Sequence, residues 1–550
     1  MSFRKRTFGE RFWEIIPGAM FWATAFFAIF FSANHPVGVA VFIIIFDLYW
    51  LFKAVNGAAH LISAYRKLKL FETINWQEYA RKLSDFLSYS VFLDEQSNQA
   101  KTAFSRKYHE SEKERIEKLI GKGRRGGEFM DYYHLVVLPF VNESFEVLST
   151  TFEALKKINY PRERLMVILA SEERAGAAAA QAAAEIKAKF AEDFYRLFVT
   201  VHPDGLAGEI RGKSANASYA VGSVLPELEN MGIAVEQVLV SNFDSDTIVH
   251  PEYFGRVIYE FLTAEKPYRR SYQPIALYNN NIWDSPSFIR VVSVSNSFWQ
   301  FIESSRPNRL RTFSSHTMTL RALIDAGFWR KDLVNEDGYI FWQCFFHYKG
   351  DYEVTPLFIS VSLDTCLADT YTQTLVNQYK QKRRWAYNVE YYPTLMPALL
   401  KMKISLWEKI YKVFQFVEGN YTWATASIVI AALGWLPLVL GGQVFRQSVV
   451  ALNLPQVTSF LMTIATIFLI FSVLINIVLL PPRPAKYSIW RTINMYLQWF
   501  LVPIVSVVFG SLPAVEAQTR LMLGRYMEFW VTPKTRKGDI QAQLGAEAKT

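Results

Sequence analysis

Two apolar segments near the N-terminus constrain the fold of this chain more than any other feature of its sequence. Residues 15–31 and 37–60 each approach the ~20 residues that a helix needs to cross a bilayer. A short turn without Lys or Arg separates them, whereas both outer flanks are rich in Lys and Arg. Because basic residues favour the cytoplasmic side of a membrane, we expect residues 1–70 to form a transmembrane hairpin with both ends in the cytoplasm. No cleavable signal peptide is evident.

Further apolar segments follow in the C-terminal part of the chain. Residues 421–440 and 457–480 predict two spans, and the amphipathic residues 406–417 predict a helix on the membrane surface. Residues 495–515 are also apolar, but two Pro and one Gly interrupt them and basic residues follow. We therefore expect residues 404–515 to contain an interfacial helix, two spans and a re-entrant or interfacial segment.

The net charge of +9 does not by itself indicate a nucleic-acid partner. Lys and Arg cluster beside the apolar segments, where membrane topology accounts for them, so no nucleic acid is expected. Cys344 and Cys366, the only two cysteines, support no disulfide framework and are typical of a reducing compartment. We expect a multi-pass protein of the plasma (inner) membrane whose central region faces the cytoplasm.

A region of ordinary globular composition lies between the two apolar parts. Residues 71–130 are charged and predict a helical linker, and residues 131–403 alternate short apolar runs with amphipathic stretches. Such alternation predicts a parallel, Rossmann-like α/β sheet. Polar side chains follow its strands, whose carboxyl ends meet at one edge where ligands bind. These side chains belong to Asn142, Glu143, Glu172, Lys213, Asp244 and Asp246.

One of these strands, within residues 238–246, ends in two carboxylates a single residue apart, those of Asp244 and Asp246. Carboxylates at this spacing can hold Mg²⁺ or Mn²⁺ and leave other coordination positions for phosphate oxygens. Alone the pattern is weak, because a turn or a helix cap after a strand has the same spacing.

Two later motifs give this pair a context. Glu336 and Asp337 precede an aromatic helix, and Gln381, Arg384 and Trp385 form a Q-x-x-R-W sequence. With the earlier D-x-D pair, their order resembles the motif pattern of membrane-bound family 2 glycosyltransferases such as cellulose, chitin and hyaluronan synthases. Residues 529–534 similarly resemble the F-x-V-T-x-K gating loop of bacterial cellulose synthase.

The resemblance implies an α/β GT-A glycosyltransferase domain over residues 131–403, set in a polytopic α-helical membrane domain, with the gating motif and a polar tail in residues 516–550. It implies that Asp337, paired with Glu336, is the catalytic base. It places the nucleotide sugar against Asn142, Glu143, Glu172, Lys213, Asp244, Gln381 and Arg384, with the metal on Asp246 and Asp244. Trp385 would stack on the acceptor, His316 would approach the acceptor or cap a helix, and Phe529, Val531, Thr532 and Lys534 would gate the pocket.

The chemistry of these side chains suits the implied roles. A carboxylate such as that of Asp337 can take the proton of an acceptor hydroxyl as the new bond forms. The leaving diphosphate gathers negative charge, which a divalent cation and the forked guanidinium of Arg384 stabilise. Two positions depart from the family pattern: Glu172 stands where relatives commonly carry Asp, and Asn335 stands where they carry Thr.

With this resemblance, the sequence predicts a hexosyltransferase that transfers sugar with inversion from a nucleotide sugar, expected to be a UDP-sugar. The acceptor is expected to be a growing β-linked polysaccharide, which the enzyme extends processively. Synthesis would be coupled to export, with or without partner proteins. The alternative is a single transfer to a lipid acceptor such as polyprenyl phosphate or diacylglycerol, which product length would distinguish. A third hypothesis is a transporter or scaffold with a degenerate soluble domain. Normal turnover after Asp337→Asn and Asp246→Ala substitutions would favour it.

Overall fold

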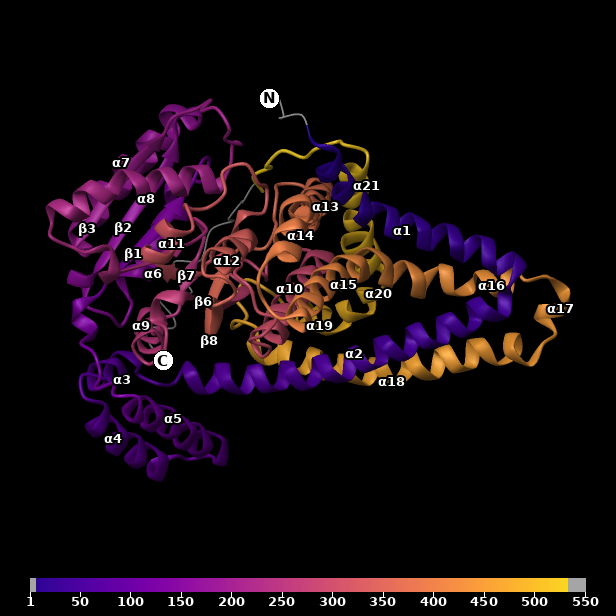
Figure 1. The fold of residues 1–550 in the computed structure, drawn as a ribbon, viewed down its shortest axis with the longest axis horizontal. Helices are drawn as coiled ribbons and strands as arrows, with labels where there is room; N and C mark the ends of the chain where they lie inside the picture. The colour runs from indigo at the N-terminus through magenta and orange to yellow at the C-terminus, as the bar shows by residue number, and fades with distance from the viewer. Residues whose placement is uncertain (1–5, 533–550) are drawn as a thin grey trace.

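The computed structural model describes residues 6–532, with all their side chains except those of residues 468, 469 and 472. Figure 1 shows a globular α/β part at one end and a narrow bundle of long helices at the other. Helices from the two ends of the sequence lie side by side in this bundle, although the α/β region separates them in the chain. They are α1 (Phe8–Asn34), α2 (Pro36–Phe71), α15 (Leu406–Ala431), α16 (Leu436–Leu440), α17 (Gly442–Arg446) and α18 (Val449–Leu479).

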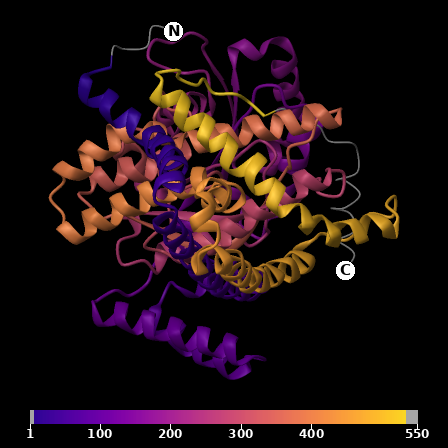
Figure 2. The same cartoon turned by 90° about the vertical axis from the view of Figure 1, so that its right-hand side faces the viewer.

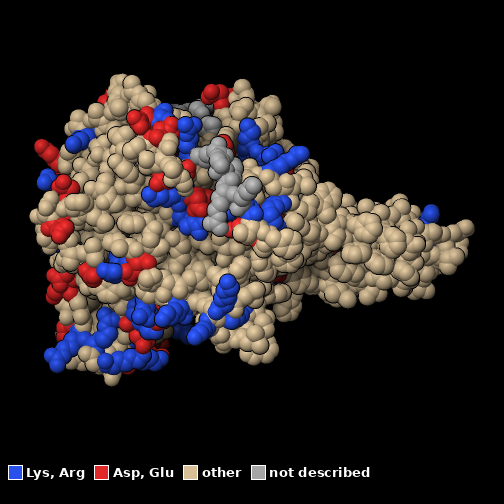
Figure 3. Space-filling model, turned by 45° about the horizontal axis from the view of Figure 1, so that its top comes forward, with Lys and Arg blue, Asp and Glu red and all other residues tan. Residues whose placement is uncertain are grey.

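Within residues 6–532, four helical segments are long and apolar enough to cross a membrane, and a bent pair of helices is a fifth candidate. Figure 3 shows that the surface of the bundle in view is nearly free of charged side chains. Both predicted N-terminal spans are therefore present as candidate membrane helices. The four segments are Phe8–Asn34, Pro36–Phe71, Val449–Ile467 and Ile489–Met522, and the pair is Leu406–Ala431 with Leu433–Leu440.

The boundaries of the C-terminal helices differ from those expected from the sequence. The predicted surface helix and the first half of the following span form one continuous helix, α15, whose N-cap Ser405 accepts the backbone N–H of Glu408. The chain then bends by 48° before Leu440 instead of continuing straight. Pro437 lies just beyond the bend, and a proline cannot donate the backbone hydrogen bond that a straight helix requires.

The last apolar segment runs crosswise to the bundle. It consists of α19 (Ile489–Leu497), α20 (Val502–Val505), a π-helical turn (Ser506–Ser511) and α21 (Leu512–Met522). Figure 2, which looks along the bundle, shows α21 lying across the view. Its length and composition would allow it to span a membrane, whereas its crosswise path suits the predicted interfacial segment, which stays a prediction.

The α/β part is built on one eight-stranded sheet of order β3-β2-β1-β4-β7-β6-β8-β5. The four strands from β3 to β4 pair in parallel, as the alternation of strands and helices predicted. The prediction of a parallel sheet holds only in part for the other half, because β6 and β8 pair in parallel whereas β7 pairs antiparallel with both β4 and β6 and β5 pairs antiparallel with β8. The strands are β1 (Tyr133–Pro139), β2 (Leu165–Glu172), β3 (Arg196–His202), β4 (Val238–Asn242), β5 (Ile248–Val249), β6 (Arg270–Tyr278), β7 (Thr317–Thr319) and β8 (Glu353–Leu363).

Helices cover both faces of this sheet and connect its strands (Figure 1). Those that carry the motifs are α12 and α13, which lie beyond the carboxyl ends of the strands. The helices are α6 (Phe145–Lys156), α7 (Gly176–Phe190), α8 (Lys213–Asn230), α9 (Tyr253–Leu262), α10 (Ser287–Ser304), α11 (Leu320–Asp325), α12 (Glu336–His347), α13 (Tyr371–Ala386) and α14 (Tyr392–Lys401).

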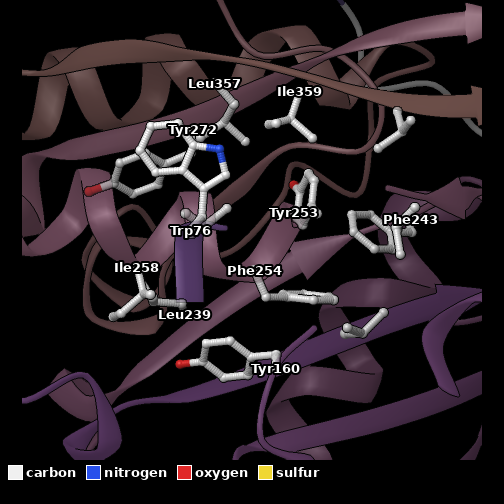
Figure 4. Close-up of a cluster of buried hydrophobic side chains, with 14 of the residues drawn as sticks. Trp76, Tyr160, Leu239, Phe243, Tyr253, Phe254, Ile258, Tyr272, Leu357 and Ile359 are labelled. Atoms are coloured by element: carbon white, nitrogen blue, oxygen red, sulfur yellow. The ribbon is translucent and has the colours of Figure 1, made fainter. Parts of the chain in front are cut away.

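The charged region before the sheet forms three helices, α3 (Trp76–Lys82), α4 (Phe86–Gln99) and α5 (Ala103–Gly121). Trp76 of α3 is fully buried and lies in an aromatic cluster with Tyr253 and Phe254 of α9 and Tyr272 of β6 (Figure 4). Its indole N–H donates to the carbonyl of Phe71 over 2.7 Å, so the buried polar atom is satisfied. The charged region thus packs against the α/β part through this indole and through further buried side chains such as those of Tyr79, Phe86 and Tyr89.

The close approach of α3 to α9 gives a stability prediction at Gly255. A Cβ atom there would lie 2.8 Å from the backbone N of Gln77 and 3.0 Å from the carbonyl carbon of Trp76. Gly255→Val should therefore lower the free energy of unfolding by about 1–3 kcal/mol, as overpacking does. Thermal unfolding measures the change, with Gly222→Val as the control because no atom lies within 4 Å of a Cβ at Gly222. Equal melting temperatures for both variants would contradict this packing.

Candidate active site

A cavity of about 830 Å³ lies between the carboxyl ends of the strands and helices α12 and α13. It also reaches α2 and α15, so it joins the α/β part to the helical bundle. Most of the side chains singled out in the sequence line it. They are Glu143, Glu172, Lys213, Asp244, Asp246, Glu336, Asp337, Gln381, Arg384, Trp385, Phe529, Val531 and Thr532.

Lys213 and Asp244 form an ion pair at one wall of the cavity. Lys213, at the first position of α8, donates from Nζ to Oδ1 of Asp244 over 2.8 Å and lies 3.7 Å from Oδ1 of Asp337. Burial alone would lower the pKa of Lys213, but Asp244 and Asp337 raise it above its ordinary value. The hydroxyl of Ser314 donates to the second oxygen of Asp244 over 2.7 Å. A permanent positive charge therefore lies among the predicted donor-binding carboxylates.

Asp246 is buried beside a carboxylate that the sequence did not single out. Its Oδ2 accepts the backbone N–H of Asp364 over 2.8 Å, and Asp364 follows β8. The side chain of Asn280 donates to Oδ1 of Asp364 over 2.9 Å. Asp364 has a signal like that of Asp246, a carboxylate within a few residues of a strand end, but Pro356 within β8 obscured that strand.

The carboxylates of Asp244 and Asp246 can hold a cation only together with further ligands. Across residues 6–532, no three His, Cys, Asp or Glu side chains group so as to hold a metal ion. Asp244 and Asp246 supply carboxylate oxygens, and Mg²⁺ is commonly bound by one or two carboxylates together with substrate phosphates and water. The residues present therefore fit a hard divalent cation that arrives with a diphosphate.

Glu336 and Asp337 begin α12 but differ in environment. Glu336 is 2% exposed, and its burial, together with the neighbouring Asp337, raises its pKa well above the ordinary value. The side chain of Asp337 is 24% exposed, lines the cavity, and its Oδ1 accepts no hydrogen bond from the described residues. Of the two carboxylates, Asp337 is thus the one placed to accept a proton from a bound molecule.

The carboxylate of the half-buried Glu390, outside the predicted motifs, holds the loop between α11 and α12 just before this pair. Its Oε1 accepts the backbone N–H groups of Val334 and Asn335 over 2.9 and 2.8 Å. The side chain of Asn335 in turn donates to the backbone carbonyl of Arg384 over 2.8 Å. Asn335, which departs from the family pattern, thus links the start of α12 to α13.

The titration of Glu390 should make the stability of the protein depend on pH, because burial raises the pKa of this carboxyl from 4.5 to about 8. A folded-state pKa above the unfolded value means that the stabilising contribution is full below pH 4.5 and is lost as the pH rises towards about 8. Glu390→Gln keeps an acceptor oxygen but cannot titrate. Melting temperatures across this pH range should decline less steeply in the variant than in the unsubstituted protein, and equal slopes would contradict the assignment.

The residues of the Q-x-x-R-W sequence lie on one face of α13, as their spacing requires. Arg384 lines the cavity with its guanidinium 4.7 Å from the ring of Phe529, and burial lowers its pKa from the ordinary value. The side chain of Gln381 donates to the hydroxyl of Thr532 over 3.4 Å. The indole of Trp385 lies 6.0 Å from the ring of Tyr278, the last residue of β6.

The C-terminal segment that resembles a gating loop lies against this group. A Cβ atom on Gly212 would approach the ring of Phe529 to 3.1 Å, so the missing side chain at Gly212 makes room for that ring. Val531 and Thr532 also line the cavity. Lys534, the fourth predicted gating residue, lies outside the described residues.

Two predicted residues lie away from the cavity. Asn142 is exposed and does not line it, although its neighbours Val141 and Glu143 do. His316 is fully buried, with Nδ1 2.8 Å from the carbonyl oxygen of Phe313 and Nε2 accepting the indole N–H of Trp329 over 3.3 Å. His316 does not line the cavity, and the N-cap of α11 is Thr319. The acceptor contact expected of His316 stays a prediction.

Comparison with known proteins gives no matching family model and no match among curated proteins. The chain is similar to the solved structure of the mannosyltransferase PcManGT from Pyrobaculum calidifontis in complex with GDP-Man and Mn²⁺, with 14% identity, a TM-score of 0.35, and coverage of 68% of this chain and 86% of that chain. It is also similar to a fragment of S. aureus TarS in complex with UDP-GlcNAc, with 12% identity, a TM-score of 0.36, and coverage of 72% and 93%.

Proposed function

We propose that this protein transfers a sugar, with inversion, from a nucleotide sugar to an acceptor hydroxyl at the cytoplasmic face of a membrane. One observation carries the proposal. A single cavity is lined by the carboxylates of Asp244, Asp246 and Asp337, by the amine of Lys213 and by the guanidinium of Arg384. Together they supply a proton acceptor and the positive charge that a leaving diphosphate needs.

The donor, by this proposal a UDP-sugar, would lie along the edge formed by Glu143, Glu172, Lys213 and Gln381. Asp246 and Asp244 would hold Mg²⁺ or Mn²⁺, which when bound neutralises charge on the diphosphate. Arg384 lies across the cavity from the sheet, and its fork can bind two phosphate oxygens. Phe529 lies against that guanidinium and would help to exclude water from the site.

The reaction follows from the position of Asp337. Its carboxylate takes the proton from the acceptor hydroxyl while the hydroxyl oxygen bonds to the anomeric carbon of the donor sugar. The bond between that carbon and the diphosphate oxygen breaks, and the electron pair leaves with the nucleoside diphosphate. Attack opposite to the leaving group inverts the anomeric configuration. Burial of Glu336 favours its neutral form, so it would position Asp337 without competing for the proton.

The acceptor would be a growing β-linked polysaccharide that receives successive sugars and is exported. The Q-x-x-R-W sequence and the segment that contains Phe529 support this choice through their resemblance to family 2 synthases. The rings of Trp385 and Tyr278 line the cavity and offer flat faces to a sugar. The candidate membrane helices support a multi-pass protein of the inner membrane with the catalytic part in the cytoplasm.

A lipid acceptor is the second candidate, and the extent of the cavity favours it. The lining includes Trp50 and Lys53 of α2 and Gly419 and Thr422 of α15. Because both helices belong to the bundle, a lipid head group such as that of a polyprenyl phosphate or a diacylglycerol could enter from the bilayer.

Purified protein incubated with a panel of nucleotide sugars and Mg²⁺ or Mn²⁺ tests the proposal. One donor should give free nucleoside diphosphate and a glycosylated product, and Asp246→Ala should abolish both. A long water-soluble or insoluble product would support processive synthesis, whereas an organic-soluble product with one added sugar would favour the lipid acceptor. Absence of nucleotide release with every donor would reject sugar transfer.

A further inference from the structure

The end of the cavity nearest the bundle carries an excess of positive charge. Lys53 of α2 lies 2.5 Å from Glu418 of α15, and Arg309 lies 3.6 Å from the second oxygen of the same carboxylate. Glu303 lies 3.6 Å from Arg306 and 3.7 Å from Arg309. Two carboxylates, Glu418 and Glu303, therefore face three cations, and all five side chains line the cavity.

Arg311 adds a fourth cation, which forms no direct ion pair in the described part of the chain. Its guanidinium lies 4.4 Å from the ring of Trp342 and 5.7 Å from the ring of Phe416, and it lines the same cavity. Burial lowers the pKa of Arg311 from 12.5 to about 10, so the group stays positive at neutral pH. Taking this charge partly out of water is costly, and Glu303, the carboxylate that acts on Arg311 from a distance, already pairs with Arg306 and Arg309. A bound anion would offset that cost.

The position of Arg311 relative to the proposed base is set by α12. Trp342, on which the guanidinium lies, follows Asp337 by five residues of the same helix, a rise of about 7.5 Å. An anion at Arg311 is therefore displaced from the reacting hydroxyl at Asp337. The donor diphosphate has its own cations, Lys213 and Arg384, near the strand ends. The second basic group is thus available to the acceptor.

We propose that the acceptor is a lipid whose head group bears both a phosphate and a hydroxyl, with the phosphate bound by Arg311 and Arg309 while the hydroxyl reaches Asp337. This inference rests on the proposed transferase function and takes up its second candidate, the lipid acceptor, in place of the polysaccharide. A lipid is favoured over an acidic glycan because α2 and α15, two helices of the bundle, form this end of the cavity. Guanidinium groups suit phosphate oxygens, which they bind through paired charge-assisted hydrogen bonds.

Lipid binding to the full chain tests the proposal without requiring turnover. The protein carrying Asp337→Asn is placed in phosphatidylcholine nanodiscs that contain phosphatidylglycerol, which has a phosphate and free hydroxyls, or diacylglycerol, which has a hydroxyl but no phosphate. Native mass spectrometry measures the retained test lipid. Phosphatidylglycerol should be retained in preference to diacylglycerol, and Arg311→Gln should weaken its retention roughly tenfold or more, as loss of a hydrogen bond to a charged group does.

Arg321→Gln is the matched control, because Arg321 pairs with Asp325 and does not line the cavity. Arg321→Gln should retain as much phosphatidylglycerol as the protein in which Arg311 and Arg321 are both unsubstituted. Equal retention of the two lipids, or equal retention by Arg311→Gln and Arg321→Gln, would overturn the proposal. Binding of a soluble oligouronide that depends on Arg311, without lipid preference, would overturn it in favour of an acidic glycan. Nucleotide release by the protein with an intact Asp337 is measured separately, so failure of lipid binding and failure of sugar transfer are distinguishable.

Discussion

Replacement of Asp337 by Asn should lower the rate of sugar transfer about 10²–10⁴-fold, the range that general base catalysis contributes. Asn keeps the shape of the side chain but cannot take the proton of the acceptor hydroxyl. Asp337 is the more exposed member of the acidic pair that lines the cavity, and its Oδ1 lies 3.7 Å from Nζ of Lys213. The rate is measured as nucleoside diphosphate released from the donor that the panel identifies.

Asp332→Asn is the control for this substitution. Asp332 pairs with Arg330 and does not line the cavity, so its replacement should leave the rate nearly unchanged. Nucleoside diphosphate should still bind to Asp337→Asn with nearly normal affinity, because Asp337 acts on the acceptor. A normal rate of transfer in Asp337→Asn would contradict the assignment of Asp337 as the catalytic base.

Arg384→Gln should lower the same rate about 10²–10³-fold, as loss of one preorganised group that stabilises developing charge does. The half-buried side chain of Arg384 lines the cavity, and its guanidinium faces the ring of Phe529. Arg384→Lys should recover only part of the rate, because an ammonium group cannot bind two phosphate oxygens in the planar geometry of a guanidinium. Single-turnover measurements at saturating donor isolate the chemical step.

Arg330→Gln serves as the control, since Arg330 forms a surface pair with Asp332. It should keep nearly the full rate. A loss in Arg384→Gln that appears only in donor affinity, with an unchanged single-turnover rate, would show that Arg384 does not stabilise the leaving diphosphate in the transition state.

The parts of the site that the sequence predicted share a local signal. Asp244 and Asp246 follow a short apolar strand, and Gln381, Arg384 and Trp385 are spaced to share a helix face. These patterns involve neighbours in the chain, so they could be recognised without a structure. Most of the residues they predict do line one cavity.

The parts that were missed depend on contacts between distant segments. Strands β6 and β8 each contain a proline, and β7 has three residues, so none showed a clear strand pattern. Asp364 and Tyr278 at their ends were missed with them. Glu390 lies over fifty positions from the backbone groups that it binds, and only folding brings Arg311 against Trp342.

Cryo-electron microscopy of the full chain with UDP and Mn²⁺ tests the central claim most directly. We predict density for the diphosphate between Lys213 and Arg384, with the cation against Asp246. Density for the nucleotide elsewhere on the chain, or a cavity that stays closed to it at saturating concentration, would contradict the account.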